Sequence, residues 1–544
     1  MSFRTYLPAD RKNSSPNLPI PGREAEMVKN SAGGYVFSVD CWKQLLRFLV
    51  LGTEGGTYYA SQEKLTTTNT KNVDLCISTD GLRTVKTVVE VSQSGRAPKN
   101  DPALFVLARC AASPNSETRK AALEALPQVA RIGTHLFHFA AYVDNMRGWG
   151  RGLRQGIGNW YQEKSDLALV NQITKYQQRD GWSHRDLLRL GHPKTTDPVR
   201  NAIYKYIVKG ELPGNLNSKA IDYLSAVETL KKDISGSEVL RLMSIYNLPM
   251  EVIPTDKRNR EVYEMLLETG GLTWLLRNLG NLSKQGILVD QNFSQVNKVC
   301  SRLTNPEDIK RARIHPIAIL SALLTYSSGS GFRSSSSWSV SQKVVNALND
   351  ALHIAFGNVE PTGKRILIGL DVSGSMTIGD IAGVPGLTPR QASAAMCMIQ
   401  LAVEQNCIVK GFSHQLIDLS INPRATLNTV VAYLNTIPFG ATDCSLPMRW
   451  AQQARADFDA FIIYTDNETG SAYGRNQWSP ARSHPAQELT KYRSNFVRDA
   501  KLITVGMTAT NCSIADPSDA GMLDVVGFDQ ATPQIIRDFI VGDI

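Results

Sequence analysis

The stretch RILIGLDVSGSMT, residues 365–377, decides the fold of the C-terminal part of the chain. Its first half is a short, apolar, β-branched run that ends at Asp371. Such a run is typical of a strand that is buried on both faces, as in a parallel sheet. Ser373 and Ser375 follow at once, so three hard oxygen donors stand directly after the strand. In open α/β sheets, ligands bind in the crevice at the carboxyl ends of the strands.

The same rhythm continues to the end of the chain. We predict strands and helices that alternate, with strands at 365–370, 408–412, 460–465 and 501–506 and helices near 389–405, 445–456 and 485–500. This alternation favours a doubly wound, Rossmann-like α/β domain over residues 361–544. Asp371 and Asp466 each end a strand, so both carboxylates are expected at one edge of the sheet.

The loops after these strands predict a metal site. The first loop carries Asp371, Ser373 and Ser375, the second (FGATDCSLP) carries Thr442, and the third (YTDNETG) carries Asp466. Two carboxylates and three hydroxyls, without thiol or imidazole, suit Mg²⁺, or alternatively Mn²⁺ or Ca²⁺, and do not suit zinc. Each fragment alone is also common turn chemistry at helix starts. The three fragments together favour the metal.

Enzyme interpretations of the same residues are weaker. A phosphotransfer aspartate normally has a second acid two residues later, where this chain has Ser373. No paired Asp-Thr/Ser-Gly motif, Gly-x-Ser-x-Gly elbow or phosphate-binding P-loop occurs. We therefore expect no catalytic residue.

Residues 35–355 differ in character from the C-terminal part. Apolar residues recur every three or four positions in segments such as 41–50, 119–132, 237–248, 261–279 and 315–326, which predicts a succession of helices and favours a degenerate α-solenoid. Residues 1–25 are polar and proline-rich, and residues 327–339 (SSGSGFRSSSSWS) are serine-rich, so both are predicted to be mobile.

Composition places the chain among soluble globular proteins. It has 544 residues, 42% hydrophobic and 20% charged, which is enough for two or more domains. There is no apolar N-terminal signal region and no apolar run that could span a bilayer. The eight cysteines are scattered without a Cys-x-x-Cys pair, which predicts a reducing, cytoplasmic location.

Positive charge is concentrated in the helical part. Basic residues exceed acidic ones by 12 in residues 1–360, whereas acidic residues exceed basic ones by 3 from residue 361 onward. The segment 147–209 alone holds 12 Lys and Arg against 5 Asp and Glu. A field of one sign points to a polyanionic partner, nucleic acid first, although a solvated helical face is the plain alternative.

Within this basic segment we predict a set of RNA-contacting side chains. Arg147, Arg151 and Arg154 fall on one side of a helix whose other side is apolar, and the capped helix at 183–190 carries further cations. Trp149, Trp182, Tyr176 and Tyr204 lie among the charges and could stack on unpaired bases, whereas Trp160 is expected in the core. The candidates are Arg147, Arg151, Arg154, Lys175, Arg179, His184, Arg185, Arg189 and His192.

Two family resemblances follow from these motifs. DVSGSM, GATDC and TDNET together resemble the metal-ion-dependent adhesion site (MIDAS) of a von Willebrand factor A domain, in which a bound cation grips an acidic group of a partner. The segments IGTHLFHF (132–139), WGRGLR (149–154), TKYQQRDGWSHRDLLRL (174–190) and ARIHPIAIL (312–320) resemble the Ro RNA-binding proteins, which join a TROVE module to an A domain.

The second resemblance implies an organisation and a function. It implies a flexible N-terminus (1–25), a TROVE α-helical, HEAT-like repeat ring (26–360) and an A domain (361–544) that bridges the ends of the ring. It further implies a cytoplasmic, monomeric, non-enzymatic scaffold that binds Y RNA and the single-stranded 3′ ends of misfolded noncoding RNA. By the same resemblance, Lys175, Arg179, His184 and Arg185 are candidates for Y RNA contacts, and Arg313 and His315 are weaker candidates for the cavity of the ring. Quality control or delivery to an exoribonuclease such as polynucleotide phosphorylase would follow.

Two other functions compete with this hypothesis. One is a metal-dependent protein-adhesion scaffold without an RNA substrate, whose A domain captures an acidic partner while the basic helices serve solubility or contact membranes. The other is a ribonuclease that uses His184 or His315, for which no second acid or paired histidine stands nearby in the sequence.

Overall fold

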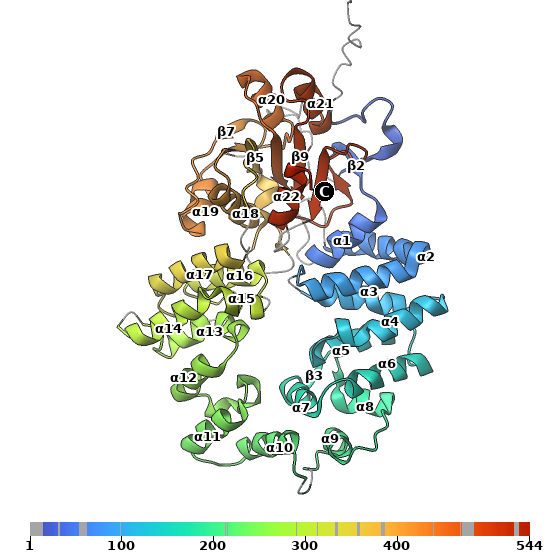
Figure 1. Ribbon diagram of the computed structural model, residues 1–544, viewed down its shortest axis with the longest axis vertical. Helices are drawn as coiled ribbons and strands as arrows, with labels where there is room; N and C mark the ends of the chain where they lie inside the picture. Colours follow the sequence, from blue (N-terminus) through green and yellow to red (C-terminus); the bar gives the residue numbers. More distant parts are fainter. Residues whose placement is uncertain are drawn as a thin grey trace, which may run out of the picture. The chain divides into compact units, whose positions relative to one another are not determined.

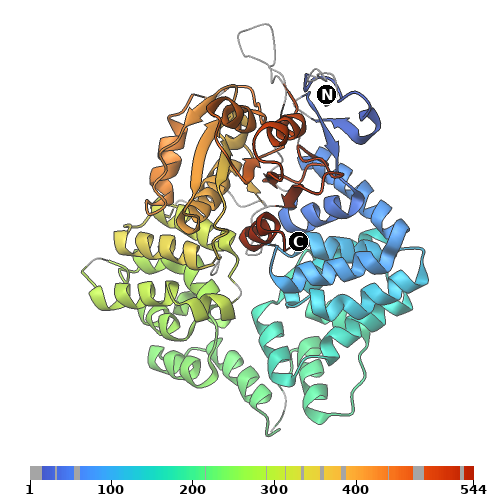
Figure 2. The same cartoon turned by 45° about the horizontal axis from the view of Figure 1, so that its top comes forward.

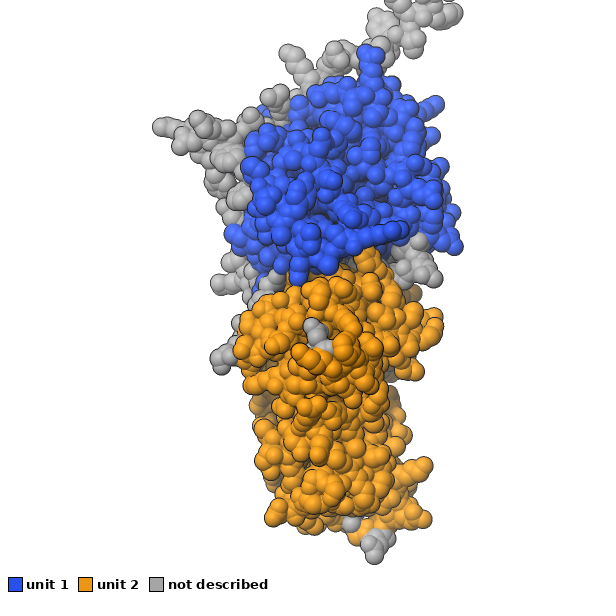
Figure 3. Space-filling view, turned by 90° about the vertical axis from the view of Figure 1, so that its left-hand side faces the viewer, with its two compact units in different colours: residues 1–69, 356–544 blue, residues 70–355 orange. Residues whose placement is uncertain are grey.

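The computed structural model describes most of the chain. The described residues are 15–30, 33–53, 62–97, 99–212, 214, 216–289, 291–312, 314–331, 336–355, 360–381, 387–438, 440–467, 469, 483–526 and 532–543. The chain forms two units, residues 1–69 with 356–544 and residues 70–355, which Figure 3 colours separately.

The first unit is built on a six-stranded sheet. Its strands are β5 (Ile366–Asp371), β6 (Cys407–Phe412), β7 (Leu416–Asp418), β8 (Ala460–Thr465), β9 (Lys501–Gly506) and β11 (Met522–Val526). Their spatial order is β11-β9-β8-β5-β6-β7, and only the edge strand β7 runs antiparallel to its neighbour. Every residue of β5 and β8 is buried, as the uninterrupted apolar runs predict. The predicted doubly wound domain is therefore confirmed.

Helices cover both faces of this sheet. They are α18 (Pro389–Val403), α19 (Leu427–Asn435), α20 (Leu446–Ala454), α21 (Pro485–Asn495) and α22 (Thr532–Val541). Both α18 and α20 pack on β5, and in Figure 1 α18 and α19 lie on the opposite side of the sheet from α20 and α21. Thr388 begins α18 with a capping box that it shares with Gln391, and Pro389 follows at the first helical position.

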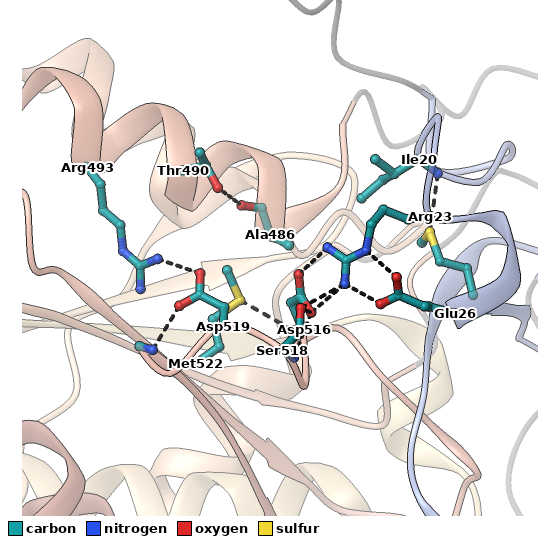
Figure 4. Close-up of polar contacts among 12 residues, drawn as sticks. Ile20, Arg23, Glu26, Ala486, Thr490, Arg493, Asp516, Ser518, Asp519 and Met522 are labelled. Atoms are coloured by element: carbon teal, nitrogen blue, oxygen red, sulfur yellow. Dashed lines mark hydrogen bonds and ion pairs between the residues drawn. The ribbon is translucent and has the colours of Figure 1, made fainter.

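The start of the chain belongs to the same unit. Its elements are η1 (Glu24–Glu26), β1 (Met27–Lys29), β2 (Tyr35–Ser38) and α1 (Cys41–Leu51). Strand β2 pairs antiparallel with β10 (Cys512–Ser513), and the Arg47 guanidinium forms a buried ion pair with Asp524. Figure 4 shows a second attachment, in which Arg23 donates to both carboxylate oxygens of Asp516 at 2.6 and 2.8 Å.

This attachment places residues beyond the predicted boundary at residue 25 in the same unit as the A domain, whereas the predicted boundary at residue 360 lies close to the observed division between residues 355 and 356. Residues 15–25 of the predicted mobile N-terminus are described and include Arg23, while residues 1–14 lie outside the described residues. The signal for β2 was missed because its partner β10 is more than 470 residues away, and a strand of four residues has a weak pattern.

The second unit consists of helices, shown from two directions in Figures 1 and 2. They are α2 (Gln62–Ser94), α3 (Asp101–Ala112), α4 (Ser116–Val129), α5 (Gly133–Met146), α6 (Arg151–Gln162), α7 (Asp166–Lys175), α8 (His184–Gly191), α9 (Pro198–Lys209), α10 (Lys219–Leu230), α11 (Gly236–Tyr246), α12 (Arg260–Thr269), α13 (Leu272–Lys284), α14 (Phe293–Leu303), α15 (Pro306–Arg311), α16 (Pro316–Ser327) and α17 (Gln342–Ala355). A short hairpin of β3 (Gln178–Arg179) and β4 (Trp182–Ser183) precedes α8.

Helices close in sequence pack on one another, as in a repeat protein. Helix α3 packs on α4 and α5, α4 packs on α6, α6 packs on α8, and α16 packs on α17. Polar caps fix the helix starts, for example Asn115, Ser165, Ser183 and Ser218. The predicted helical module is thus confirmed, whereas the predicted ring bridged by the A domain stays a prediction.

The serine-rich stretch 327–339 is only partly described, because residues 332–335 lie outside the described residues. The Trp338 ring stacks on Tyr326 with centroids 6.5 Å apart, and its indole N–H donates to the Tyr326 carbonyl at 3.1 Å. The C-terminal end of this stretch is therefore anchored to α16.

Candidate functional site

Two of the predicted metal ligands lie at the ends of neighbouring strands, where the sheet reverses its strand order. Asp371 is the last residue of β5, and Asp466 directly follows β8, its parallel neighbour. The chain leaves β5 for β6 on one side and returns to β8 on the other, so a topological switch point lies between β5 and β8. This is the position at which doubly wound folds bind ligands.

Hydrogen bonds hold the first loop in place. One Asp371 oxygen accepts from the Ser373 backbone N–H at 2.9 Å, and the other accepts from the Thr465 hydroxyl at 2.8 Å. The Ser373 and Ser375 hydroxyl oxygens are 2.9 Å apart. The buried Arg390 guanidinium donates to the carbonyls of Val372 and Ser373 at 2.8 and 3.0 Å. The loop that carries three predicted ligands is therefore fixed by its own polar contacts.

Two observations fit a hard cation at this position. All five predicted ligands are at most 4% exposed, and among the described residues the Thr442 hydroxyl is buried without a hydrogen-bond partner. A buried hydroxyl without a partner loses free energy unless something binds it. Burial also raises the pKa of Asp371, although hydrogen bonds from Ser373 and Thr465 oppose that shift. A cation would favour the ionised carboxylate.

The donor set also argues for the type of metal. Within the described part of the chain, no three His, Cys, Asp or Glu side chains lie together as a metal-binding group, and the candidate set at the switch point contains only two carboxylates beside its three hydroxyls. The oxygen atoms at the switch point come largely from hydroxyls, which suits Mg²⁺.

The N-terminal segment supports the third loop of this site. The buried Asn30 side chain donates to the Thr469 carbonyl at 2.7 Å and to the Asn467 carbonyl at 3.4 Å. Thr469 in turn donates its hydroxyl to the Thr442 carbonyl at 3.3 Å. Asn30 therefore reaches a predicted metal ligand through one intervening residue. No sequence pattern indicated this role.

The predicted basic surface is present on α6 and α8. Arg147, Arg151 and Arg154 are exposed, while Leu153, Ile157 and Trp160 on the other side of α6 are buried. Arg151 and Arg154 thus share the exposed side of α6, opposite its apolar side, whereas Arg147 ends α5 and does not belong to this helix as predicted. The Trp160 indole N–H donates to the Ala130 carbonyl at 2.5 Å, which fits its predicted core position.

The predicted cations on α8 and in the segment before it differ in whether an acidic side chain pairs with them. Arg185 and Arg189 are exposed and, within the described residues, have no ion-pair partner. Lys175 forms an ion pair with Glu251 at 3.3 Å, and Arg179 approaches Asp180 at 3.9 Å. His192 ends α8 in a left-handed conformation and is exposed. Arg185 and Arg189 are thus the most available to an anion.

Two predicted histidines occupy different places from those expected. His184 is 4% exposed and packs against Phe137 with ring centroids 4.7 Å apart, and its Nδ1 lies 2.8 Å from the Tyr161 hydroxyl. Burial lowers its pKa to about 3. The expectation that His184 contacts phosphate or a base at the surface is therefore corrected, because its ring is part of the core.

His315 is likewise a structural residue in its position. It is 7% exposed and caps α16, where its Nδ1 accepts from the Ile317 backbone N–H at 3.1 Å. Its Nε2 lies 2.9 Å from the Arg96 carbonyl oxygen, 219 residues away in sequence. The expectation of an open cavity position is corrected for His315, and Arg313 lies outside the described residues.

The aromatic candidates are also redistributed. Tyr204 is 7% exposed and lies in the core, which contradicts its expected stacking role. Trp149 and Trp182 are half-buried and contact each other, with ring centroids 5.0 Å apart. This pair links the segment before α6 to the β3–β4 hairpin.

A groove beside α6 contains cations that the sequence did not single out. It has a volume of about 530 Å³ and is lined by residues of α3 to α6, including Arg119 and Lys120. These two residues belong to the amphipathic segment 119–132, whose only clear signal was helical periodicity. Their proximity to Arg147 follows from helix packing, not from sequence spacing.

The fold and the site together define a class of protein. Proteins of this class have a helical module with a cationic surface, followed by an A-type α/β domain with an oxygen-rich cluster at the switch point of its sheet. The chain matches the TROVE domain over residues 28–244 and 249–328, and the Ro60 vWA domain over residues 365–540.

Individual relatives agree with this class. The chain is 45% identical over 522 residues to the RNA-binding protein RO60 of Deinococcus radiodurans, with 96% of each chain covered. It is 34% identical over 595 residues to the RNA-binding protein RO60 of Caenorhabditis elegans, with 95% of this chain and 90% of the relative covered. The crystal structure of the D. radiodurans RO (RSR) protein matches with a TM-score of 0.71 and 45% identity, covering 93% of this chain and all of that one. The chain belongs to the Ro60 family.

One further property concerns membranes. In the part of the chain that the structure describes, no helix combines the length and apolar character needed to cross a bilayer.

Proposed function

We propose that the protein is a non-enzymatic RNA-binding scaffold. The observation that carries the proposal is the set of exposed, unpaired guanidiniums on α6 and α8, of which Arg151, Arg154, Arg185 and Arg189 have no acidic partner among the described residues. Unneutralised cations on one surface attract phosphates, and release of counterions drives the binding. Two relatives, from D. radiodurans and C. elegans, are named RNA-binding proteins, which supports the same ligand class.

The finer form of the proposal concerns which RNA is bound. We infer Y RNA and the single-stranded 3′ ends of misfolded noncoding RNA, in a cytoplasmic monomer. Presentation of such RNA to an exoribonuclease such as polynucleotide phosphorylase would then serve quality control. His184 and His315 are buried, which supports a role without catalysis, since a general acid or base must reach its substrate.

A metal ion is the second part of the proposal. Asp371, Ser373, Ser375, Thr442 and Asp466 would hold Mg²⁺ at the switch point, and the partnerless Thr442 hydroxyl supports this assignment. When bound, such a cation offers an open coordination position to an acidic group of a partner protein.

RNA retention tests the first part. The protein is purified at low ionic strength and its absorbance at 260 nm is followed. We expect an excess that disappears after a high-salt wash, because phosphate contacts weaken steeply with salt. In gel shifts, a Y-type stem-loop and an RNA with a single-stranded end are expected to compete. The competition is expected because the two RNAs would occupy adjoining surfaces of the helical module. Saturation with one RNA that leaves binding of the other unchanged would contradict this expectation.

Thermal unfolding tests the metal. Titration with Mg²⁺ or Mn²⁺ is expected to raise the melting temperature of the native protein, because a ligand that binds only the folded state stabilises it. Asp371→Ala should lose the shift, and so should Thr442→Val, which keeps the shape of the side chain and removes only its hydroxyl. A metal-induced shift that is equal in all three proteins would contradict the proposed site.

A further inference from the structure

The groove between α4 and α6 has a composition suited to an anion. Its cationic residues come from two helices and the turn before α6, namely Arg119, Lys120, Arg147 and Arg151. Glu124 is its one acidic lining residue, and Lys120 lies 3.9 Å from that carboxylate. The balance of charge in the groove therefore remains positive.

Two of its guanidiniums converge on a single oxygen. Arg119 donates to the Ser113 carbonyl at 2.8 Å, and Arg147 donates to the same carbonyl at 3.3 Å. Arg119 also donates to the Pro114 carbonyl at 2.6 Å. Neither guanidinium has a carboxylate partner among the described residues. Like charges held this close repel each other, so an anion beside them would relieve the repulsion.

The beginning of α6 leaves room for that anion. Gly150 is the N-cap residue and provides no capping side chain, and Arg151 in the first turn is exposed. A Cβ atom added at Gly150 would meet no atom within 4 Å, and the same holds for Gly148. The first backbone N–H groups of α6 therefore receive no side-chain cap from Gly150. They would donate to an anion bound in the groove, in addition to the Arg119 and Arg147 guanidiniums.

The size and the apolar lining indicate more than a bare phosphate. A groove of about 530 Å³ falls in the range of small-ligand sites. Leu123, Val143 and Leu153 also line it, which gives a ribose or base an apolar surface. A duplex keeps its bases paired and stacked and cannot place a single nucleotide in such a groove, whereas an unpaired strand can.

We propose that this groove binds one unpaired nucleotide of an RNA strand, with a phosphate held by Arg119, Arg147 and Arg151. The proposal rests on the proposed RNA-binding function and deepens it. It adds Arg119 on α4 to the cations of α6, and it gives the helical module a subsite for single-stranded RNA.

Substitutions at Gly150 test the proposal without disturbing the fold. Gly150 has φ of −83° and ψ of 171°, which any residue adopts, and Asp and Ser are preferred N-cap residues. Gly150→Asp would place a negative charge in the groove that the two guanidiniums also line, and it would cap the first N–H groups of α6. Gly150→Ser provides a cap without charge, so it separates the effect of occupied N–H groups from the effect of the added charge. Both variants should keep the melting temperature of the native protein.

Binding of uridine 3′,5′-bisphosphate is measured by calorimetry, and binding of a fluorescein-labelled oligouridylate is measured by fluorescence anisotropy. We expect Gly150→Asp and the double variant Arg119→Gln/Arg147→Gln to weaken binding of the bisphosphate at least tenfold. Gly150→Ser should weaken binding less than Gly150→Asp does, and Lys86→Gln, an exposed position that does not line the groove, should leave binding unchanged. In the native protein the bisphosphate should displace part of the bound oligonucleotide.

The outcomes separate this proposal from the proposed function. If the native protein binds the oligonucleotide while both charge variants bind the bisphosphate as the native protein does, the groove is not the subsite and the RNA-binding function stands. If the native protein binds no oligonucleotide, the proposed function fails. Weaker bisphosphate binding in Gly150→Asp than in Gly150→Ser, with Lys86→Gln unchanged, supports the groove.

Discussion

The buried position of His184 leads to a prediction about stability in acid. Burial lowers the pKa of this imidazole from 6.5 to about 3 in the folded protein. In the unfolded chain the same ring takes up a proton near pH 6.5. Because the unfolded state then binds more protons, stability is lost as the pH falls below about 6.5, and this loss continues to about pH 3.

The magnitude follows from the two pKa values. Between pH 7 and pH 5, His184 should remove about 2 kcal/mol from the free energy of unfolding. Burial also lowers the pKa of His135 to about 3, so the native protein should lose more than this amount. The contribution of His184 is the difference between the native protein and His184→Gln, in which position 184 no longer titrates.

Urea unfolding at pH 7 and pH 5, followed by far-ultraviolet circular dichroism, measures this difference. His184→Gln should be less stable at pH 7, and its further loss at pH 5 should be smaller than that of the native protein by about 2 kcal/mol. Tyr161→Phe is the control, since it removes the hydroxyl 2.8 Å from Nδ1 and keeps the titrating ring. An unchanged pH dependence in His184→Gln would refute the core assignment, and so would a selective loss of RNA affinity at pH 7 with stability intact.

Three further predictions concern packing and support of the sites. Arg47→Met leaves the buried Asp524 carboxylate without its cation, so the stability of the first unit should fall by about 3–5 kcal/mol. Hydrogen exchange should then become faster in β9 and β11, while exchange in α10 of the second unit should stay unchanged. Asn30→Ala removes the support of the Thr469 carbonyl, and Mn²⁺ affinity measured by electron paramagnetic resonance should fall about 10–100-fold; equal affinity in both proteins would rule out this role. Gly191→Ala places a Cβ atom 3.1 Å from the backbone of α6, so thermal unfolding should reveal a loss of about 1–3 kcal/mol, and an unchanged melting temperature would contradict the close helix packing.

Local patterns predicted the elements of the A domain well. The strand expected at 460–465 forms as Ala460–Thr465, and that at 365–370 forms as Ile366–Asp371. These runs are decided by uninterrupted apolar residues, which have few alternatives to a buried strand. Because parallel strands end at one edge, the proximity of the first and third loops of the candidate metal site also followed from sequence.

Features that depend on distant parts of the chain were not predictable. The cations that flank His184 in sequence suggested a surface position, yet its ring turns inward against Phe137 and Tyr161. The pairing of β2 with β10 and the support of Thr469 by Asn30 join segments more than 430 residues apart, and no local periodicity encodes such a partner. The same reason explains why Arg119 was not connected with Arg147.

The measurement that tests the central claim most directly is the salt dependence of RNA affinity when four cations of the helical module are neutralised. The variant replaces Lys175, Arg179, Arg185 and Arg189 by Gln, with the exposed Lys86→Gln as a control. The account predicts much weaker binding at low salt and a slope of log affinity against log salt that is shallower by about 0.7 for each phosphate that the variant no longer binds. RNA affinity and slope equal to those of the native protein, in a variant that is fully folded, would contradict the account.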